Sequence, residues 1–301
     1  FSLLLLFAHG LLQAQELKVS SGFVQRFENF KSAFVDARNI DVWLPKGYNT
    51  AEKYAVIYMH DGQMLFDANT TWNKQAWEVD EVAGKLNAEG KVKKFIVVGI
   101  WNIAAKRHPE YFPQKPYESL TAVQKDTVTA QLQKAGRTKE VFKPYSDLYL
   151  KFLVTELKPF IDKRFATAPD KDNTFIAGSS MGGLISLYAI CEYPQVFGAA
   201  ACISTHWPGI FAVENNPIPD AFYAYMRKQL PDPKTHRIYF DYGDQTLDAL
   251  YPPLQKRADA VMTEKGFTAA HWTTQFFPGK NHSEEAWSER LHIPMEFLLR
   301  K

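Results

Sequence analysis

Short, continuously apolar runs alternate with helical patterns along most of this chain. We expect the runs at 54–59, 95–101, 174–177, 198–203, 238–240 and 273–276 to form strands, after two stretches rich in strand formers at 19–30 and 39–44. The helical patterns between and after them are 77–87, 148–160, 181–192, 250–265 and 284–299. Strands that are apolar on both faces must be covered by helices on both sides. The alternation therefore predicts an α/β fold with a doubly wound, mostly parallel sheet.

Residues 103–146 interrupt this alternation. The segment has no strand pattern, four prolines and a polar helical stretch near 121–134. Long irregular segments inside compact domains usually form the lids or walls of binding sites. Two interpretations stay open, an active-site insertion and a disordered insertion.

Composition and charge exclude several classes of protein. Lys and Arg total 35 against 33 Asp and Glu, which leaves a net charge of +2 and no basic footprint for a nucleic-acid partner. Hydrophobic residues at 46% and charged residues at 23% exclude a disordered chain. The two cysteines, Cys191 and Cys202, lie in apolar surroundings, and we expect them to be inert buried side chains.

The strand expected at 174–177 runs directly into the sequence Gly-Ser-Ser-Met-Gly-Gly at 178–183, after which a helix begins. A G-x-S-x-G sequence between a strand and a helix is typical of a nucleophile elbow, a sharp turn that exposes a serine and needs small neighbours. This context predicts Ser180 as the nucleophile of an α/β-hydrolase fold. The N–H of Met181, at the start of the helix, would then face the oxyanion of a tetrahedral intermediate.

A second oxyanion donor is expected in the loop after the first central strand. The sequence there is His-Asp-Gly-Gln at 60–63, in which Gly62 lets the backbone approach closely. We assign the donor to the N–H of Gln63. His60 and Asp61 could form a ligand pair or a dyad, but we interpret them as hydrogen-bonded supports of the loop.

In this fold the acid and the histidine of a Ser-His-Asp triad follow the serine, each after a later strand. The strand at 238–240 is followed by Asp244 and Asp248. We favour Asp248 because it precedes the next helix and can reach back toward the serine, and Asp244 remains the alternative. His282 lies in a Gly- and Asn-containing loop after the last strand, and we predict it as the base.

Together these residues resemble the "Putative esterase" (esterase D-like) family of α/β-hydrolases, which includes feruloyl and acetylxylan esterases and enterochelin-type siderophore esterases. The resemblance spans roughly 42–298 and rests on 58–63, 178–183, Asp248 and 278–284. In the family an Asp-Gly-x turn and the residue after the serine supply the oxyanion N–H groups, which implies Gln63 and Met181. The family's His-x-Glu-x-x-Trp run is present at 282–287, with His-Ser-Glu in place of the commoner His-Asn-Glu.

The resemblance implies a carboxylic-ester hydrolase, and a serine mechanism needs neither metal nor organic cofactor. Candidate substrate contacts follow strand ends at the expected catalytic edge, and they are Trp101, Asn102, Arg107, His206 and Trp207. Aromatic rings with scattered polar groups suit a small-molecule or oligosaccharide ester, and feruloyl or acetyl groups on carbohydrate are the leading hypothesis. The alternatives are a siderophore esterase, an acyltransferase and a catalytically silent binding protein of the same fold.

Other aromatic residues are divided between the site and the core. We expect Tyr111 at the catalytic edge with Trp101 and Trp207, where substitution would change substrate choice. Phe175, Phe240 and Phe276 lie inside expected strands and are assigned to the core.

The first residues are apolar and lead to Gln-Ala-Gln at 13–15. They are too few for a membrane span and are typical of the apolar core and cleavage region of a secretory signal peptide. We expect residues 1–14 to be a signal peptide, truncated at its start, and residues 15–301 to form a single secreted or periplasmic catalytic domain without a membrane partner. The alternative is a buried N-terminal strand or helix.

Overall fold

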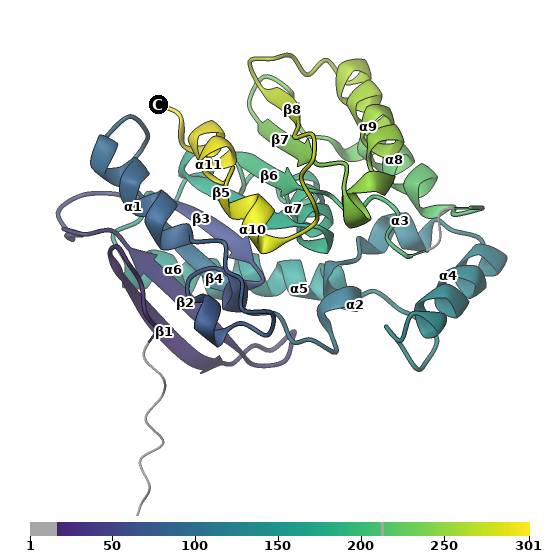
Figure 1. Cartoon of the computed structure of the whole chain (residues 1–301), viewed down its shortest axis with the longest axis horizontal. Helices are drawn as coiled ribbons and strands as arrows, with labels where there is room; N and C mark the ends of the chain where they lie inside the picture. The colour runs from purple at the N-terminus through teal and green to yellow at the C-terminus, as the bar shows by residue number, and fades with distance from the viewer. Residues whose placement is uncertain (1–16, 212–213) are drawn as a thin grey trace, which may run out of the picture.

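The computed structural model describes residues 17–211 and 214–301, and an eight-stranded sheet runs through these residues (Figure 1). The strand order is β1-β2-β4-β3-β5-β6-β7-β8. β2 is antiparallel to β1 and β4, and the strands from β4 to β8 pair in parallel, so the predicted mostly parallel sheet is confirmed. The strands are β1 (Phe23–Phe30), β2 (Arg38–Leu44), β3 (Ala55–His60), β4 (Phe95–Ile100), β5 (Thr174–Ser179), β6 (Ala199–Ile203), β7 (Arg237–Tyr242) and β8 (Trp272–Phe276).

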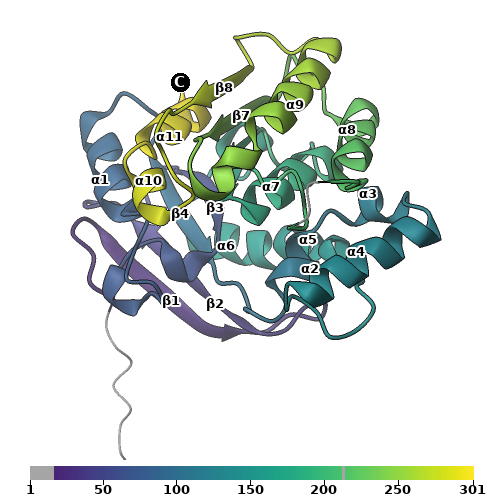
Figure 2. The ribbon, with the colours of Figure 1, turned by 45° about the vertical axis from the view of Figure 1, so that its right-hand side comes forward.

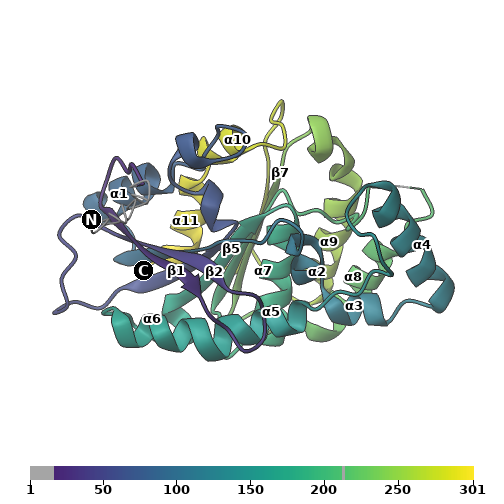
Figure 3. The same ribbon diagram turned by 90° about the horizontal axis from the view of Figure 1, so that it is seen from below.

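Helices cover both faces of this sheet (Figure 3). One face packs against α1 (Val79–Glu89), α10 (Glu284–Ser288) and α11 (His292–Leu299). The other face packs against α5 (Ser146–Phe152), α6 (Lys158–Arg164), α7 (Met181–Glu192), α8 (Ile218–Gln229) and α9 (Pro252–Glu264). A turn of π-helix at Leu153–Leu157 joins α5 to α6.

The central strands are buried on both sides, which explains why their sequences are continuously apolar. Successive side chains of a strand point to opposite faces. In β3, Val56 and Tyr58 therefore belong to one buried cluster, whereas Ile57 and Met59 belong to the other.

The segment at 103–146 is an ordered, mainly helical insertion, so the disordered alternative is wrong. It contains α2 (Arg107–Tyr111), α3 (Gln114–Glu118) and α4 (Ala122–Lys134), which Figure 2 shows grouped at one end of the molecule. A capping box between Thr121 and Gln124 begins α4. Side chains of the insertion, including Phe112 and Leu132, are fully buried in the larger core cluster. The helices α2, α3 and α8 are not among the elements that periodicity predicts.

The burial of the aromatic residues assigned to the core depends on where their strand lies in the sheet. Phe175 and Phe240 are fully buried, as predicted, but Phe276 is 49% exposed, and its assignment to the core is wrong. Phe276 ends β8, which has a neighbouring strand on one side only. Its ring stacks on Tyr242 of β7, with ring centroids 5.2 Å apart.

The remaining sequence-based expectations concern the cysteines and the apolar leader. Cys191 and Cys202 are buried free thiols, as predicted, and burial raises the pKa of both. The expected signal peptide at 1–14 lies outside the described residues. No helix within 17–211 or 214–301 is long and apolar enough to cross a membrane.

Candidate active site

Ser180 lies in a strained turn between β5 and α7. Its φ of 59° and ψ of −121° are rarely adopted by residues other than glycine, and such strain persists only where surrounding contacts hold it. The Ser180 N–H donates to the Ile203 carbonyl at 2.9 Å. A Cβ on Gly178 would lie 2.9 Å from the carbonyl carbon of Gly182, so the turn requires small residues. This geometry is that of a nucleophile elbow.

The two predicted oxyanion donors lie in adjoining turns. Met181 is the first residue of α7, and Gln63 lies in the 3₁₀ turn Gly62–Met64 directly after β3. Within the described residues neither backbone N–H has a protein acceptor. A Cβ on Gly182 would lie 3.6 Å from Oδ2 of Asp61, which shows how closely the turns approach. Both N–H groups are therefore available to an anionic oxygen.

The turn that carries Gln63 is fixed by a partly buried ion pair. Asp61 adopts a left-handed conformation, with φ of 57°. Arg107 from α2 donates two hydrogen bonds to its carboxylate, of 2.8 and 2.7 Å. Asn102 donates to the same carboxylate at 2.6 Å, and its backbone N–H donates to the Gln63 side chain at 3.1 Å. Burial raises the pKa of Asp61, but the Arg107 charge and these hydrogen bonds outweigh burial and lower it.

Arg107 and Asn102 thus contact the turn at Asp61–Gln63 directly, and their predicted contact with substrate stays a prediction. The interpretation of Asp61 and His60 as hydrogen-bonded supports agrees with the structure. Nδ1 of His60 lies 2.9 Å from the Tyr149 hydroxyl, and burial lowers the pKa of His60 to about 3.

Asp248 and His282 are hydrogen-bonded, with Nδ1 of His282 2.6 Å from Oδ1 of Asp248. The other carboxylate oxygen of Asp248 accepts from the Gly243 N–H and the Ser204 hydroxyl, each at 2.7 Å. Burial raises the pKa of Asp248, but hydrogen bonds from His282, Ser204 and Gly243 outweigh burial and hold this pKa below its ordinary value. A carboxylate held in this way fixes the orientation and tautomer of a histidine.

Asp244, the alternative acid, supports the loop instead. Its Oδ1 accepts from the Gly279 N–H at 2.8 Å, and the Asp244 N–H donates to the Lys280 carbonyl at 3.1 Å. The Thr246 hydroxyl accepts from the His282 N–H at 2.9 Å. These contacts join the loop after β7 to the loop after β8, so His282 is held beside Asp248.

Asp248 is backed by a buried hydrogen-bond network whose residues the sequence analysis did not assign to the site. Ser204 has φ of 40°, and its hydroxyl accepts from Trp287 Nε1 at 3.0 Å and from Arg290 Nη2 at 3.1 Å. Both partners are donors only, so the single hydroxyl proton of Ser204 must point to Asp248. Arg290 also contacts Asp241 of β7, which compensates the buried charge. The family-like Trp at 287 is a sequence signal for this network, whereas Ser204 has none.

His206 and Tyr251 form a second buried pair near Ser180. The His206 backbone N–H donates to the Ser180 carbonyl at 3.1 Å, and Nδ1 of His206 lies 2.9 Å from the Tyr251 hydroxyl. The Tyr251 ring meets His282 edge to face, with ring centroids 5.8 Å apart. Burial and the Asp248 charge raise the pKa of Tyr251, and a side-chain contact with Ser180 opposes this shift. The predicted substrate contact of His206 stays a prediction.

Two aromatic residues expected to contact substrate at the catalytic edge are fully buried, so neither ring is exposed to a ligand in this structure. Trp207 is 0% exposed, donates to Gln255 at 2.8 Å and packs against Phe240. Tyr111 is also 0% exposed. Trp207 follows the end of β6, but its ring points into the core, a direction that sequence position does not specify. Tyr111 lies in α2, and its hydroxyl accepts from the Asp61 N–H at 3.3 Å. Trp101 is partly exposed, and its indole donates to Asp41 at 2.7 Å.

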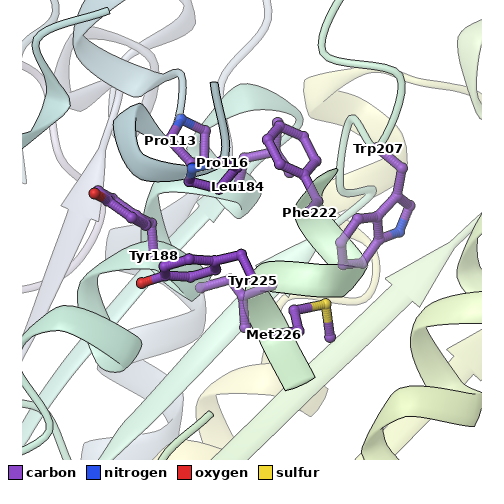
Figure 4. A pocket seen from close by; sticks show the side chains of 9 residues that line it. Pro113, Pro116, Leu184, Tyr188, Trp207, Phe222, Tyr225 and Met226 are labelled. Carbon is purple, nitrogen blue, oxygen red and sulfur yellow. The ribbon is translucent and has the colours of Figure 1, made fainter. Parts of the chain in front are cut away.

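An apolar pocket lies between α3, α7 and α8 (Figure 4). It is lined by Pro113, Pro116, Leu184, Leu187, Tyr188, Trp207, Phe222, Tyr225 and Met226. None of the predicted catalytic or oxyanion residues lines this pocket. No group of three or more His, Cys, Asp or Glu side chains in the described ranges could hold a metal ion.

Comparisons with known proteins identify the family of the chain. Residues 32–293 match the family model described as "Putative esterase". An endo-1,4-beta-xylanase/feruloyl esterase from Xylanibacter ruminicola is 26% identical over 240 residues, which are 75% of this chain and 25% of that protein. This chain thus spans about a quarter of that relative's length.

Solved structures show the same fold. A ferulic acid esterase from Anaeromyces mucronatus superposes with a TM-score of 0.62 at 18% identity, over 95% of this chain and 92% of that chain. The enterobactin esterase from Shigella flexneri gives a TM-score of 0.64 at 15% identity, over 94% of this chain and 60% of that chain. Fold and relatives together define a carboxylic-ester hydrolase of the α/β-hydrolase type. The chain belongs to the "Putative esterase" family.

Proposed function

We propose that this esterase cleaves acyl groups from carbohydrate with a Ser180–His282–Asp248 triad. The single observation that carries the triad is the 2.6 Å contact between His282 and a fully buried Asp248, in loops that follow β7 and β8. Ser180 follows β5 in the same parallel sheet. The carboxyl ends of parallel strands meet at one edge, which is where α/β enzymes place their sites.

In the proposed reaction, Oγ of Ser180 attacks the ester carbonyl carbon while Nε2 of His282 takes its proton. The carbonyl oxygen becomes an oxyanion that accepts hydrogen bonds from the N–H groups of Met181 and Gln63. The intermediate then expels the alcohol, to which His282 returns the proton, and leaves an acyl group on Ser180. Water, activated by His282, attacks this acyl-enzyme and releases the acid. Asp248 stabilises the imidazolium in both steps without taking its proton.

The carbohydrate part of the proposal is supported by relatives. The Xylanibacter protein carries the name of a xylanase and feruloyl esterase, and one neighbouring structure is a ferulic acid esterase in complex with ferulic acid. A feruloyl or acetyl ester of an oligosaccharide is therefore the proposed substrate. Secretion or a periplasmic location, proposed from the apolar leader, would place the enzyme where such polymers occur.

Rates on a panel of esters test the substrate. The purified protein is assayed with p-nitrophenyl acetate, a feruloylated arabinose oligosaccharide, acetylated xylo-oligosaccharide and ferric enterobactin. We expect the highest kcat/KM for one of the carbohydrate esters. If none is cleaved faster than p-nitrophenyl acetate, the carbohydrate proposal is wrong. Preference for ferric enterobactin would assign a siderophore esterase, and acyl transfer to an added sugar in preference to water would assign a transferase.

A further inference from the structure

Trp72 is an exposed aromatic side chain that neither the core nor the proposed triad explains. It is 84% exposed, more than any other large hydrophobic side chain in the described ranges. It lies between the oxyanion turn and α1. One exposed hydrophobic residue needs no explanation by itself, so the inference depends on how and where the loop holds it.

The loop around Trp72 is braced by its own hydrogen bonds. Asp67 accepts from the Asn69 N–H at 2.9 Å and begins a 3₁₀ turn, Ala68–Thr70. The hydroxyl of the next residue, Thr71, is buried and donates to the Ala68 carbonyl at 2.9 Å. The indole is therefore presented on ordered backbone, which lowers the entropic cost of binding.

This loop also adjoins the segment that carries His282. Asn73 donates to Glu284, the first residue of α10, at 2.8 Å. At the far end of the loop, Trp77 packs against Trp287 with ring centroids 5.2 Å apart, and Trp287 meets His282 at 4.9 Å. Figure 3 shows the loop, which precedes α1, beside α10. The loop that carries Trp72 thus packs against the segment that follows the proposed base.

The side of the site on which Trp72 lies determines which part of an ester it can touch. His282 gives its proton to the departing alcohol, so the alcohol must lie on the His282 side. Asn73 contacts the residue two positions after His282, and two residues span at most about 7 Å of chain. A group bound at this loop would therefore be part of the alcohol, beyond the unit that carries the scissile bond.

We infer that Trp72 forms an outer subsite for the alcohol part of the substrate and takes a sugar ring of an oligosaccharide ester. An uncharged indole face offers a flat apolar surface that complements the C–H face of a sugar ring. This inference rests on the proposed function, because it uses the role of His282. It extends that function from the ester bond to the chain that carries the acyl group.

Kinetics with two esters of one acid test the subsite. Wild type, Trp72→Ala and Trp72→Phe are compared on a feruloylated arabinoxylo-oligosaccharide and on methyl ferulate. We expect Trp72→Ala to raise KM for the oligosaccharide ester about fivefold to tenfold, with kcat unchanged and methyl ferulate unaffected. Trp72→Phe should retain most of the affinity, because it keeps a flat ring.

Phe23→Ala is the matched control. Phe23 is 49% exposed but begins the edge strand β1, level with the amino ends of the parallel strands, whereas Ser180 follows the carboxyl end of β5. Its loss should change the kinetics with neither substrate. Equal effects of Trp72→Ala on both esters, or no effect on either, would overturn the subsite.

Binding without catalysis separates this inference from the proposed function. Calorimetric titration of Ser180→Ala with unesterified arabinoxylo-oligosaccharide should give a Kd that Trp72→Ala, added to the same protein, weakens about fivefold to tenfold. An unchanged Kd contradicts the subsite even if the triad is right. Hydrolysis that survives in Ser180→Ala contradicts the triad, whatever Trp72 does.

Discussion

Replacing Asp248 with asparagine reverses one hydrogen bond while side-chain size is kept. In the native protein one carboxylate oxygen of Asp248 accepts from Gly243 and Ser204, and the other accepts from His282. The amide oxygen of asparagine must occupy the first position, because two donors meet there. Its NH₂ group then faces Nδ1 of His282, which has to become an acceptor. The proton moves to Nε2, and His282 cannot take the proton of Ser180.

The expected loss is about 10⁴-fold in kcat, or about 5.5 kcal/mol of transition-state stabilisation. Initial rates with p-nitrophenyl acetate measure this loss, and thermal unfolding checks that the variant folds. Asp244→Asn is the matched control. It weakens only the contact with the Gly279 N–H, so its loss should stay below about tenfold. A larger loss in Asp244→Asn than in Asp248→Asn would refute the assignment.

Three further predictions follow from the same contacts. Ser204→Ala removes the hydroxyl that donates to Asp248, so kcat with p-nitrophenyl acetate should fall about tenfold. The control is Thr205→Val, which removes a neighbouring buried hydroxyl that donates to the Cys202 carbonyl, and its effect on kcat should be smaller. Arg107→Met leaves Asp61 without its cation, so chemical denaturation should show that the free energy of unfolding falls by about 2 kcal/mol, and kcat should also fall. A variant with wild-type stability and kcat would contradict the role of this ion pair. Burial lowers the pKa of His60 from about 6.5 in the unfolded chain to about 3 in the folded protein. Between these values only the unfolded state binds the extra proton, so the free energy of unfolding decreases as the pH is lowered. The Tm should already drop between pH 6.5 and 5, and a His60→Asn variant with an undiminished drop would contradict this assignment.

The positions of the proposed triad could be read from the sequence because local pattern and chain order point to them. Ser180 lies in a G-x-S-x-G turn whose crowded backbone admits only small neighbours. His282 and Asp248 follow from chain order, since each must come after a later strand of a parallel sheet. Asp248 and Asp244 lie in one loop, so sequence position alone does not separate them. In the structure Asp248 is buried and contacts His282, whereas Asp244 contacts the Gly279 N–H.

The supporting contacts were not predictable, because they join residues far apart in the chain. Arg107 lies 46 positions from Asp61, and Ser204 lies 44 positions from Asp248. The direction of the Trp207 ring and the edge position of β8 likewise depend on packing rather than on local pattern. One signal was present in the insertion: the capping box of Thr121 and Gln124 marks an ordered helix.

Covalent trapping of the nucleophile tests the proposed chemistry most directly. The protein is treated with a serine-directed fluorophosphonate, and intact-mass and peptide mass spectrometry locate the adduct. We predict one adduct per chain, on Ser180, with loss of ester hydrolysis in proportion to labelling, and neither adduct nor hydrolysis in Ser180→Ala. An adduct on another residue, or hydrolysis by Ser180→Ala at the wild-type rate, would contradict the assignment of Ser180 as the nucleophile.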